Sequence, residues 1–115
     1  MAKYSIAVAD APDKAAAASL IRTVSNIGIA DIVSAIGTSK PIAEFDTWDF
    51  SLEMGYDEGV AHQQKRISEF LRSLRGVGAT VVVTHNAGAI SEVVSLEMLN
   101  NLFESEIQDL AQNHD

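Results

Sequence analysis

A long amphipathic segment followed directly by a run of valines is the feature that most limits how this chain can fold. Across residues 58–75 the apolar side chains recur at helical spacing and form one stripe, which predicts a helix lying on a sheet. Gly76 and Gly78 end that segment, and residues 79–84 predict a strand. Because its valines are unbroken, we expect this strand to be central and covered on both faces. The helical stripe consists of Val60, Ile67, Phe70, Leu71 and Leu74.

Four further segments carry secondary-structure patterns. Residues 4–9 alternate apolar and smaller side chains, which predicts a strand, and the alanine-rich residues 13–25 predict a helix that Asp10 can cap. Residues 42–52 predict another strand, with a bend because their aromatic side chains keep no single period. Residues 89–110 predict a last helix with a wide apolar face. Such a helix packs across the domain or, as the alternative, joins two copies in a homodimer.

Residues 29–36 fit two elements, and the choice decides the fold. Their Ile and Val residues fall at helical spacing, but β-branched residues also favour a strand. A helix gives an α/β (α+β) fold, a three- to four-stranded sheet with helices on one face and an extra C-terminal helix, which we favour. A strand gives a ferredoxin-like βαββαβ sandwich with residues 37–41 as a hairpin turn. Either way we expect a single domain over residues 1–115, with the core in 1–86 and the amphipathic helix in 87–115.

The acidic residues outnumber the basic ones and are unevenly distributed. Sixteen Asp and Glu against eight Lys and Arg give a net charge of −8. This charge disfavours binding to nucleic acid or an anionic membrane, because both ligands require cationic groups. Residues 41–64 and 87–115 each contain several acids and no Lys or Arg, and four bases lie together between the two tracts. Those bases are Lys65, Arg66, Arg72 and Arg75.

Several kinds of sequence signal are missing. The chain has no cysteine, so disulfides and thiolate chemistry are excluded, and this fits a reducing compartment. The N-terminal residues show no apolar run typical of a signal peptide, and no stretch has the length of a membrane span. We therefore expect a soluble, cytoplasmic protein.

Residues 20–32 read Leu-Ile-Arg-Thr-Val-Ser-Asn-Ile-Gly-Ile-Ala-Asp-Ile, and residues 74–81 read Leu-Arg-Gly-Val-Gly-Ala-Thr-Val. Together they resemble the C-terminal domain of the bacterial ribosomal stalk protein. That family carries an Ile-Lys-x-Val-Arg run followed by Thr-Gly-Leu-Gly-Leu-Lys-Glu-Ala, and Arg22 and Gly28 match it outright. The resemblance implies the element order strand, two consecutive helices, short strand, helix, strand. The Clp protease adaptors are similar in fold class, which implies an adaptor role.

The resemblance covers about the first 45 residues and residues 60–83. The stalk family recruits translation factors through lysines around its glycine motif, and the equivalent positions here are Ser19, Ala30 and Val33. Residues 46–59 and the predicted helix after Gly88 have no counterpart in the family. The resemblance therefore implies the fold rather than the recruitment of translation factors.

A short tract between Phe45 and Tyr56 combines aromatic and acidic side chains and is the main candidate for binding. It contains four of the seven aromatic residues. Aromatic anchors surrounded by charge are typical of protein interfaces, although Phe45 itself fits the core. The acids of this tract lack the dense spacing of a cation loop, so we predict solvated carboxylates and no metal site. The predicted partner-binding residues are Trp48, Tyr56, Asp46, Asp49 and Glu53.

The basic flank of the helix over residues 58–75 consists of Lys65, Arg72 and Arg75. These bases can meet an acidic partner, or they can pair with the acidic C-terminal helix of the same chain. Charge pairing within the protein or a dimer is the simpler interpretation, and exposed pairs of this kind stabilise little.

No motif commits the chain to catalysis. It has no phosphate-binding loop, dinucleotide fingerprint or nucleophile elbow, and its three histidines lie far apart, so we expect no cofactor or metal. His85 follows the valine strand and could act in acid–base chemistry. Without a second committed residue, we interpret His85 as a loop residue that caps the last helix with Asn86.

These observations predict a non-enzymatic protein-interaction or adaptor module that binds a protein partner through an acidic, aromatic surface. A basic protein is one such partner. One alternative is an acidic inhibitor, immunity or anti-defence protein that blocks a basic target by charge mimicry. The other alternative is a ferredoxin-like small-molecule-binding protein or small enzyme that works near His85.

Overall fold

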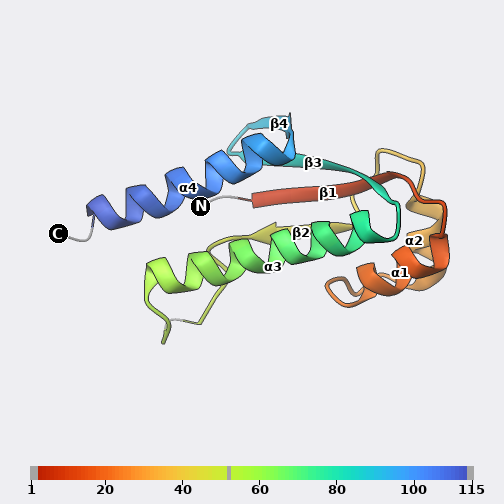
Figure 1. The fold of residues 1–115 in the computed structure, drawn as a ribbon, viewed down its shortest axis with the longest axis horizontal. Helices are drawn as coiled ribbons and strands as arrows, with labels where there is room; N and C mark the ends of the chain where they lie inside the picture. Colours follow the sequence, from red (N-terminus) through yellow and green to blue (C-terminus); the bar gives the residue numbers. More distant parts are fainter. Residues whose placement is uncertain (1–2, 52, 114–115) are drawn as a thin grey trace.

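A computed structural model describes residues 3–51 and 53–113 of the chain. Helices and strands are mixed along the sequence, and more of the described residues lie in helices than in strands. Figure 1 shows helices α3 and α4 running along the sheet, with α1 and α2 gathered at one end. The elements are β1 (Lys3–Asp10), α1 (Lys14–Arg22), α2 (Ile29–Ala35), β2 (Ala43–Asp46), α3 (Tyr56–Gly76), β3 (Thr80–Ala87), β4 (Ile90–Val94) and α4 (Leu96–Asn113).

The four strands form one antiparallel sheet in the order β2-β1-β3-β4. In its register Tyr4 lies opposite both Phe45 and His85, and Ile6 lies opposite Val83. Partners in an antiparallel pair share a face, so these side chains all point to the same side of the sheet. That side carries the core against the helices, which confirms the small sheet with helices on one face.

The other face of the sheet has no helix over it in the described chain. Ser5, Thr84 and Asn86 are only partly buried there, and Val93 is 67% exposed. The valine strand β3 is therefore central in the sheet, as predicted, but the prediction that both its faces are covered is wrong. A three-valine run is apolar enough for a doubly covered strand, yet Val82 lies on this open face and is only half-buried.

Residues 29–36 are settled as a helix. Helix α2 begins after Gly28, whose carbonyl accepts the Ile32 amide at 3.0 Å, and it ends where Ile36 becomes extended. Its apolar face buries Ile32 and Ala35. With no strand here, the ferredoxin-like alternative is wrong, and residues 3–87 have the element order that the resemblance implied.

The first helix begins at a different cap from the one predicted. Asp13 caps α1, its carboxylate accepting the Ala16 amide at 3.0 Å. Asp10 remains the last residue of β1. Pro12 lies between them and starts the turn into the helix.

The second strand is shorter than predicted. It ends at Asp46, whose side chain accepts the Trp48 amide at 2.9 Å and turns the backbone out of the sheet. The aromatic side chains of Trp48 and Phe50 therefore do not belong to a bent strand. They pack against the start of α3, while residue 52 lies outside the described residues.

The prediction that residues 89–110 form one helix is wrong at its N-terminal end. Gly88 has a φ of +62° and opens a two-residue turn of the type that joins antiparallel strands, and Ile90–Val94 pairs with β3 as β4. Helix α4 begins only at Leu96, where the Ser95 hydroxyl accepts the Met98 amide at 3.1 Å. His85 and Asn86 consequently lie in β3, and neither caps the last helix.

Two glycines of α3 give a matched test of this packing. A Cβ placed on Gly59 would lie 2.3 Å from the Phe50 ring, whereas one placed on Gly76 would meet nothing within 4 Å. We predict that Gly59→Ala lowers the free energy of unfolding by about 1–2 kcal/mol through overpacking. Gly76→Ala should leave it unchanged or raise it by up to about 1 kcal/mol. Urea denaturation measures both, and equal values for the two variants would contradict the placement of Phe50.

Candidate functional site

Three aromatic rings from the predicted binding tract form one cluster. The Trp48 ring centroid lies 5.5 Å from that of Tyr56 and 6.2 Å from that of Phe50, and Phe50 meets Tyr56 edge-on at 6.3 Å. Tyr56 is 48% exposed, whereas Trp48 and Phe50 are half-buried. Sequence reasoning placed Trp48 and Tyr56 at a binding surface, and the structure brings these two side chains together.

A carboxylate from α4 holds this cluster in place. Glu106 Oε2 accepts hydrogen bonds from Thr47 Oγ1 at 2.9 Å and from Trp48 Nε1 at 3.2 Å. Its Oε1 accepts from Gln64 Nε2 at 3.0 Å, and the same amide donates to the Phe103 carbonyl at 3.1 Å. The polar edge of Trp48 is thus used within the protein, and α4 is fixed to both α3 and the loop after β2.

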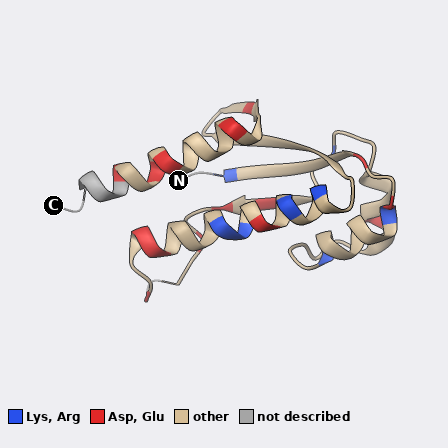
Figure 2. Ribbon diagram, in the orientation of Figure 1, with Lys and Arg blue, Asp and Glu red and all other residues tan. Residues whose placement is uncertain are grey.

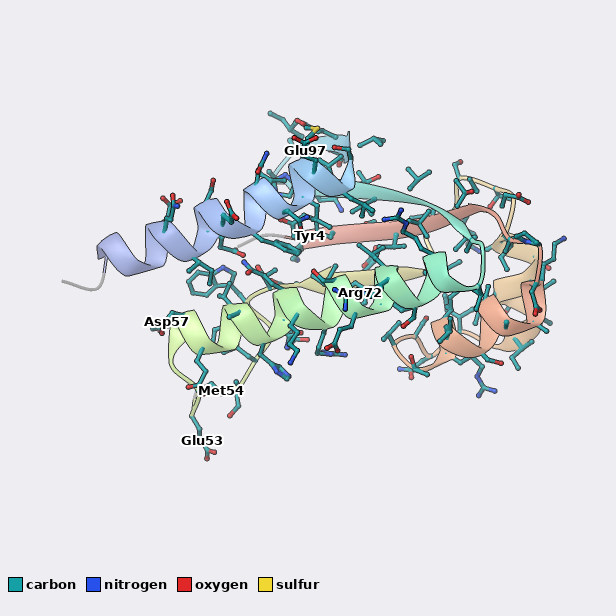
Figure 3. The ribbon with its side chains drawn as sticks, in the orientation of Figure 1. Tyr4, Glu53, Met54, Asp57, Arg72 and Glu97 are labelled. Atoms are coloured by element: carbon teal, nitrogen blue, oxygen red, sulfur yellow. The ribbon has the colours of Figure 1, made fainter. Side chains whose placement is uncertain are left out.

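The predicted acids divide into two groups. Asp46 and Asp49 line a hollow of about 480 Å³ together with Trp48, and Glu44, Lys3 and Asn86 are also part of its wall. Glu53 lies at the tip of the loop before α3 and points away from the body of the molecule (Figure 3). We call Asp46, Trp48, Asp49 and Tyr56 the acidic aromatic surface; Glu53 is not part of it.

The basic flank does not form an ion pair with α4 among the described residues. Lys65 Nζ lies 4.0 Å from Glu69 Oε1 one turn further along α3, and both side chains are largely exposed. Arg72 and Arg75 border a hollow beside Leu96 and Asn100 of α4. Figure 2 shows basic residues along α3 and acidic residues along the neighbouring helix α4.

The two positions that carry the stalk resemblance lie at helix ends. Arg22 is the last residue of α1 and is exposed. Gly28 precedes α2 in an extended conformation with a φ of −67°. Both lie on the helices at one end of the molecule, whereas Trp48 lies in the loop after β2.

His85 lies at a groove that the sequence did not reveal. Its ring stacks on Tyr4 with centroids 5.1 Å apart, and Glu92 lies directly opposite it on β4. A groove of about 440 Å³ runs between β4 and α4 beside these residues. Pairing of residues 90–94 as a strand creates this groove, so it could not be predicted while those residues were assigned to a helix. We call it the β4 groove, and its lining is His85, Ala87, Ile90, Glu92, Met98, Asn101, Leu102 and Ser105.

Tyr4 connects the two regions. It is 2% exposed, and its ring, labelled in Figure 3, stacks on that of His85 and meets that of Phe103 edge-on at 5.6 Å. Burial raises the pKa of Tyr4 from 10 to about 12, and the negative charge of Glu106 adds to this increase. The phenol is therefore a neutral core group at physiological pH.

Metal-binding clusters and membrane-spanning helices are both absent from the described residues. Across residues 3–51 and 53–113, no group of three or more His, Asp or Glu side chains is arranged to hold a metal ion. Within the same residues, no helix is both long enough and apolar enough to cross a bilayer.

No protein family, curated protein or solved structure matches this chain. The resemblance to the ribosomal stalk domain thus stays a prediction, carried by the residues quoted above. Any function has to be inferred from the two surfaces themselves.

The raised pKa of Tyr4 predicts how stability depends on pH. The folded protein keeps the phenol protonated up to about pH 12, whereas the unfolded chain loses the proton near pH 10. The contribution of Tyr4 to the free energy of unfolding is therefore complete below pH 10 and declines as the pH rises from 10 to 12. Two pKa units correspond to roughly 3 kcal/mol.

Tyr4→Phe isolates this effect, because it removes the titrating hydroxyl and keeps the ring. We expect the difference in unfolding free energy between the native protein and Tyr4→Phe to shift by roughly 3 kcal/mol across this interval, measured by urea denaturation. A difference that is independent of pH would show that the phenol is not buried as described.

Proposed function

We propose that this chain is a non-enzymatic protein-binding module that recognises a cationic protein partner through the acidic aromatic surface. The observation that carries the proposal is the junction at Glu106, where the two base-free acidic tracts of the sequence meet around the aromatic cluster. Residues 41–64 contribute Asp46 and Asp49, and residues 87–115 contribute α4. Two segments far apart in the sequence thus form a single negative region.

Electrostatic attraction and apolar contact contribute differently to the proposed binding: the first to the rate of association and the second to the affinity. The net charge of −8 attracts a basic protein over long range and raises the rate of association. Individual exposed ion pairs add little to affinity. The Tyr56 ring, 48% exposed beside Trp48, offers the rigid aromatic area that commonly carries binding energy. A cationic side chain of the partner can enter the hollow lined by Asp46 and Asp49.

The proposal covers both an adaptor and an acidic inhibitor acting in the cytoplasm, because the two differ in what the partner does rather than in how it is bound. Under this proposal residues 3–87 serve as a scaffold that resembles the stalk domain. The end of β2, the loop after it and the start of α3 carry the binding residues, and Glu106 of α4 holds Trp48 in place.

A second candidate function is binding of a small molecule in the β4 groove. Its apolar walls and the polar groups of His85, Asn101 and Ser105 have the composition of a ligand site. A thermal shift produced by a small molecule and abolished by His85→Ala would favour it over the protein-binding proposal.

Charge reversal on the surface tests the main proposal. A partner is first captured with the intact chain, and its Kd is then measured with purified proteins at several salt concentrations. We predict that Asp49→Lys and Tyr56→Ala each weaken binding about tenfold, and that native binding weakens as salt rises. Asp49 is exposed, so its replacement should not unfold the protein.

Asp10→Lys is the matched control, since it makes the same change of charge on an exposed residue. Asp10 ends β1, whereas Lys3 at the start of that strand lines the hollow beside Asp49. The control should bind within about twofold of the native protein. Equal effects of Asp49→Lys and Asp10→Lys, or a partner unaffected by Tyr56→Ala, would contradict the proposed surface.

A further inference from the structure

Apolar side chains are exposed at the outer edge of β4. β4 is the last strand of the sheet, and no described residue pairs with its outer edge. Exposed apolar side chains gather here: Ile90 is 70% exposed, Val93 67% and Met98, at the start of α4, 42%. An edge strand with exposed apolar side chains is a template for pairing with another chain.

The pairing geometry identifies which backbone groups face outward. The turn at Gly88 makes Ala87 and Ile90 the closing pair of the hairpin, which exchanges hydrogen bonds. In an antiparallel ladder such pairs alternate with pairs that direct their amides and carbonyls away. Ser91 and Val93 are therefore the residues of β4 that present N–H and C=O groups to an added strand.

Side-chain hydrogen bonds connect the edge strand to the rest of the sheet. The Ser91 hydroxyl donates to Asn86 Oδ1 at 2.7 Å, and Asn86 Nδ2 donates to the Ser5 hydroxyl at 2.9 Å. These bonds join β4 to β3 and β1 across the open face of the sheet. A pre-organised edge reduces the ordering cost of binding.

The side chains on the two faces of an added strand would contact two different surfaces. On the helix side the β4 groove, about 440 Å³ in volume, offers Ile90, Met98 and Leu102 as apolar contacts. On the open side Val93 offers a single apolar contact. An extended segment with alternating apolar side chains fits this arrangement.

The acidic side chains around β4 indicate which kind of strand can bind there. Glu92 is the central residue of β4 and lines the groove, and Glu97 lies beside the strand at the start of α4 (Figure 3). No Lys or Arg occurs after Arg75 in the sequence. A second copy pairing over the whole strand would place Glu92 opposite its own equivalent, and like charges in that position are destabilising. A cationic side chain opposite Glu92 would be stabilised instead.

We propose that the edge of β4 binds an extended segment of a partner protein that carries apolar side chains and a Lys or Arg opposite Glu92. The segment adds a fifth strand to the sheet through the backbone of Ser91 and Val93, and its apolar side chains enter the β4 groove. This site is distinct from the acidic aromatic surface and does not depend on it.

Selection from a library of short random peptides displayed on phage, with the intact chain as the target, tests the proposal. Enriched peptides should alternate apolar residues and contain Lys or Arg. Val93→Pro removes one outward N–H but no bond to β3, and Val93→Thr keeps that N–H in a side chain of the same shape. We predict that Val93→Pro weakens the enriched peptides about tenfold, while Val93→Thr changes their Kd less than threefold.

Reversing the central charge gives a second measurement. With Glu92→Lys as the target, the same library should yield peptides rich in Asp or Glu, and the cationic peptides should bind this variant about tenfold more weakly. Thermal unfolding of each variant verifies that the sheet is intact. Absence of enrichment, or enriched peptides that bind Val93→Pro as tightly as the native chain, would overturn the proposal.

Two other outcomes identify a different occupant and also overturn it. A dimer seen by light scattering that Val93→Pro dissociates would show that a second copy occupies the edge. Enriched peptides that lose affinity with Tyr56→Ala rather than Val93→Pro would place binding on the acidic aromatic surface. That last result would leave the function proposed above standing while removing the β4 site.

Discussion

The carboxylate of Glu106 is the interaction on which both candidate surfaces depend. It accepts hydrogen bonds from Thr47, Trp48 and Gln64, which belong to the loop after β2 and to α3. These bonds fix the C-terminal half of α4. A half-buried carboxylate loses part of its hydration, and three donors compensate for that loss. Because α4 is a continuous helix, fixing this half also sets where Met98 and Leu102 stand relative to β4.

The same carboxylate also lies close to a tyrosine in the interior. Tyr4 packs against His85 of β3 and Phe103 of α4, and burial together with the nearby charge of Glu106 raises the pKa of its phenol. A neutral phenol can lie in the core without a counter-ion. The core and the polar junction are thus compatible, although a negative group borders apolar rings.

Local patterns predicted the elements whose side chains repeat regularly. The apolar stripe of residues 58–75 is α3, and the valines of residues 79–84 lie in β3. At residues 29–36 the helical spacing won over β-branching, because Ile32 and Ala35 bury one face. The opposite occurred at residues 90–94, where apolar residues at helical spacing form a strand. There the turn at Gly88 brings Ile90 opposite Ala87, and pairing with β3 overrides the spacing.

The functional geometry was less accessible to sequence reasoning because it rests on distant contacts. The tract that holds Trp48 and Tyr56 was predicted as a binding surface from its composition, and the structure places the two rings in contact. Glu106 was not identified, since its partners lie 42 to 59 residues away in the chain. Likewise, the sequence shows that Ile90 and Val93 are apolar. That their side chains are exposed follows only from the position of β4 at the edge of the sheet. Composition can therefore nominate a surface, and topology decides which side chains reach it.

Both surfaces border helix α4, and this has a consequence for how partners could bind. Ser105 lines the β4 groove, and the next residue, Glu106, holds Trp48. A cationic partner with a folded body and an extended tail could then occupy both surfaces at once. Its second contact would be intramolecular, so modest affinities at each surface would combine through a high effective concentration. Two separate cationic partners would instead repel each other across α4, an effect that salt weakens. The shared helix therefore favours a single partner that binds both surfaces over two different partners that bind one surface each.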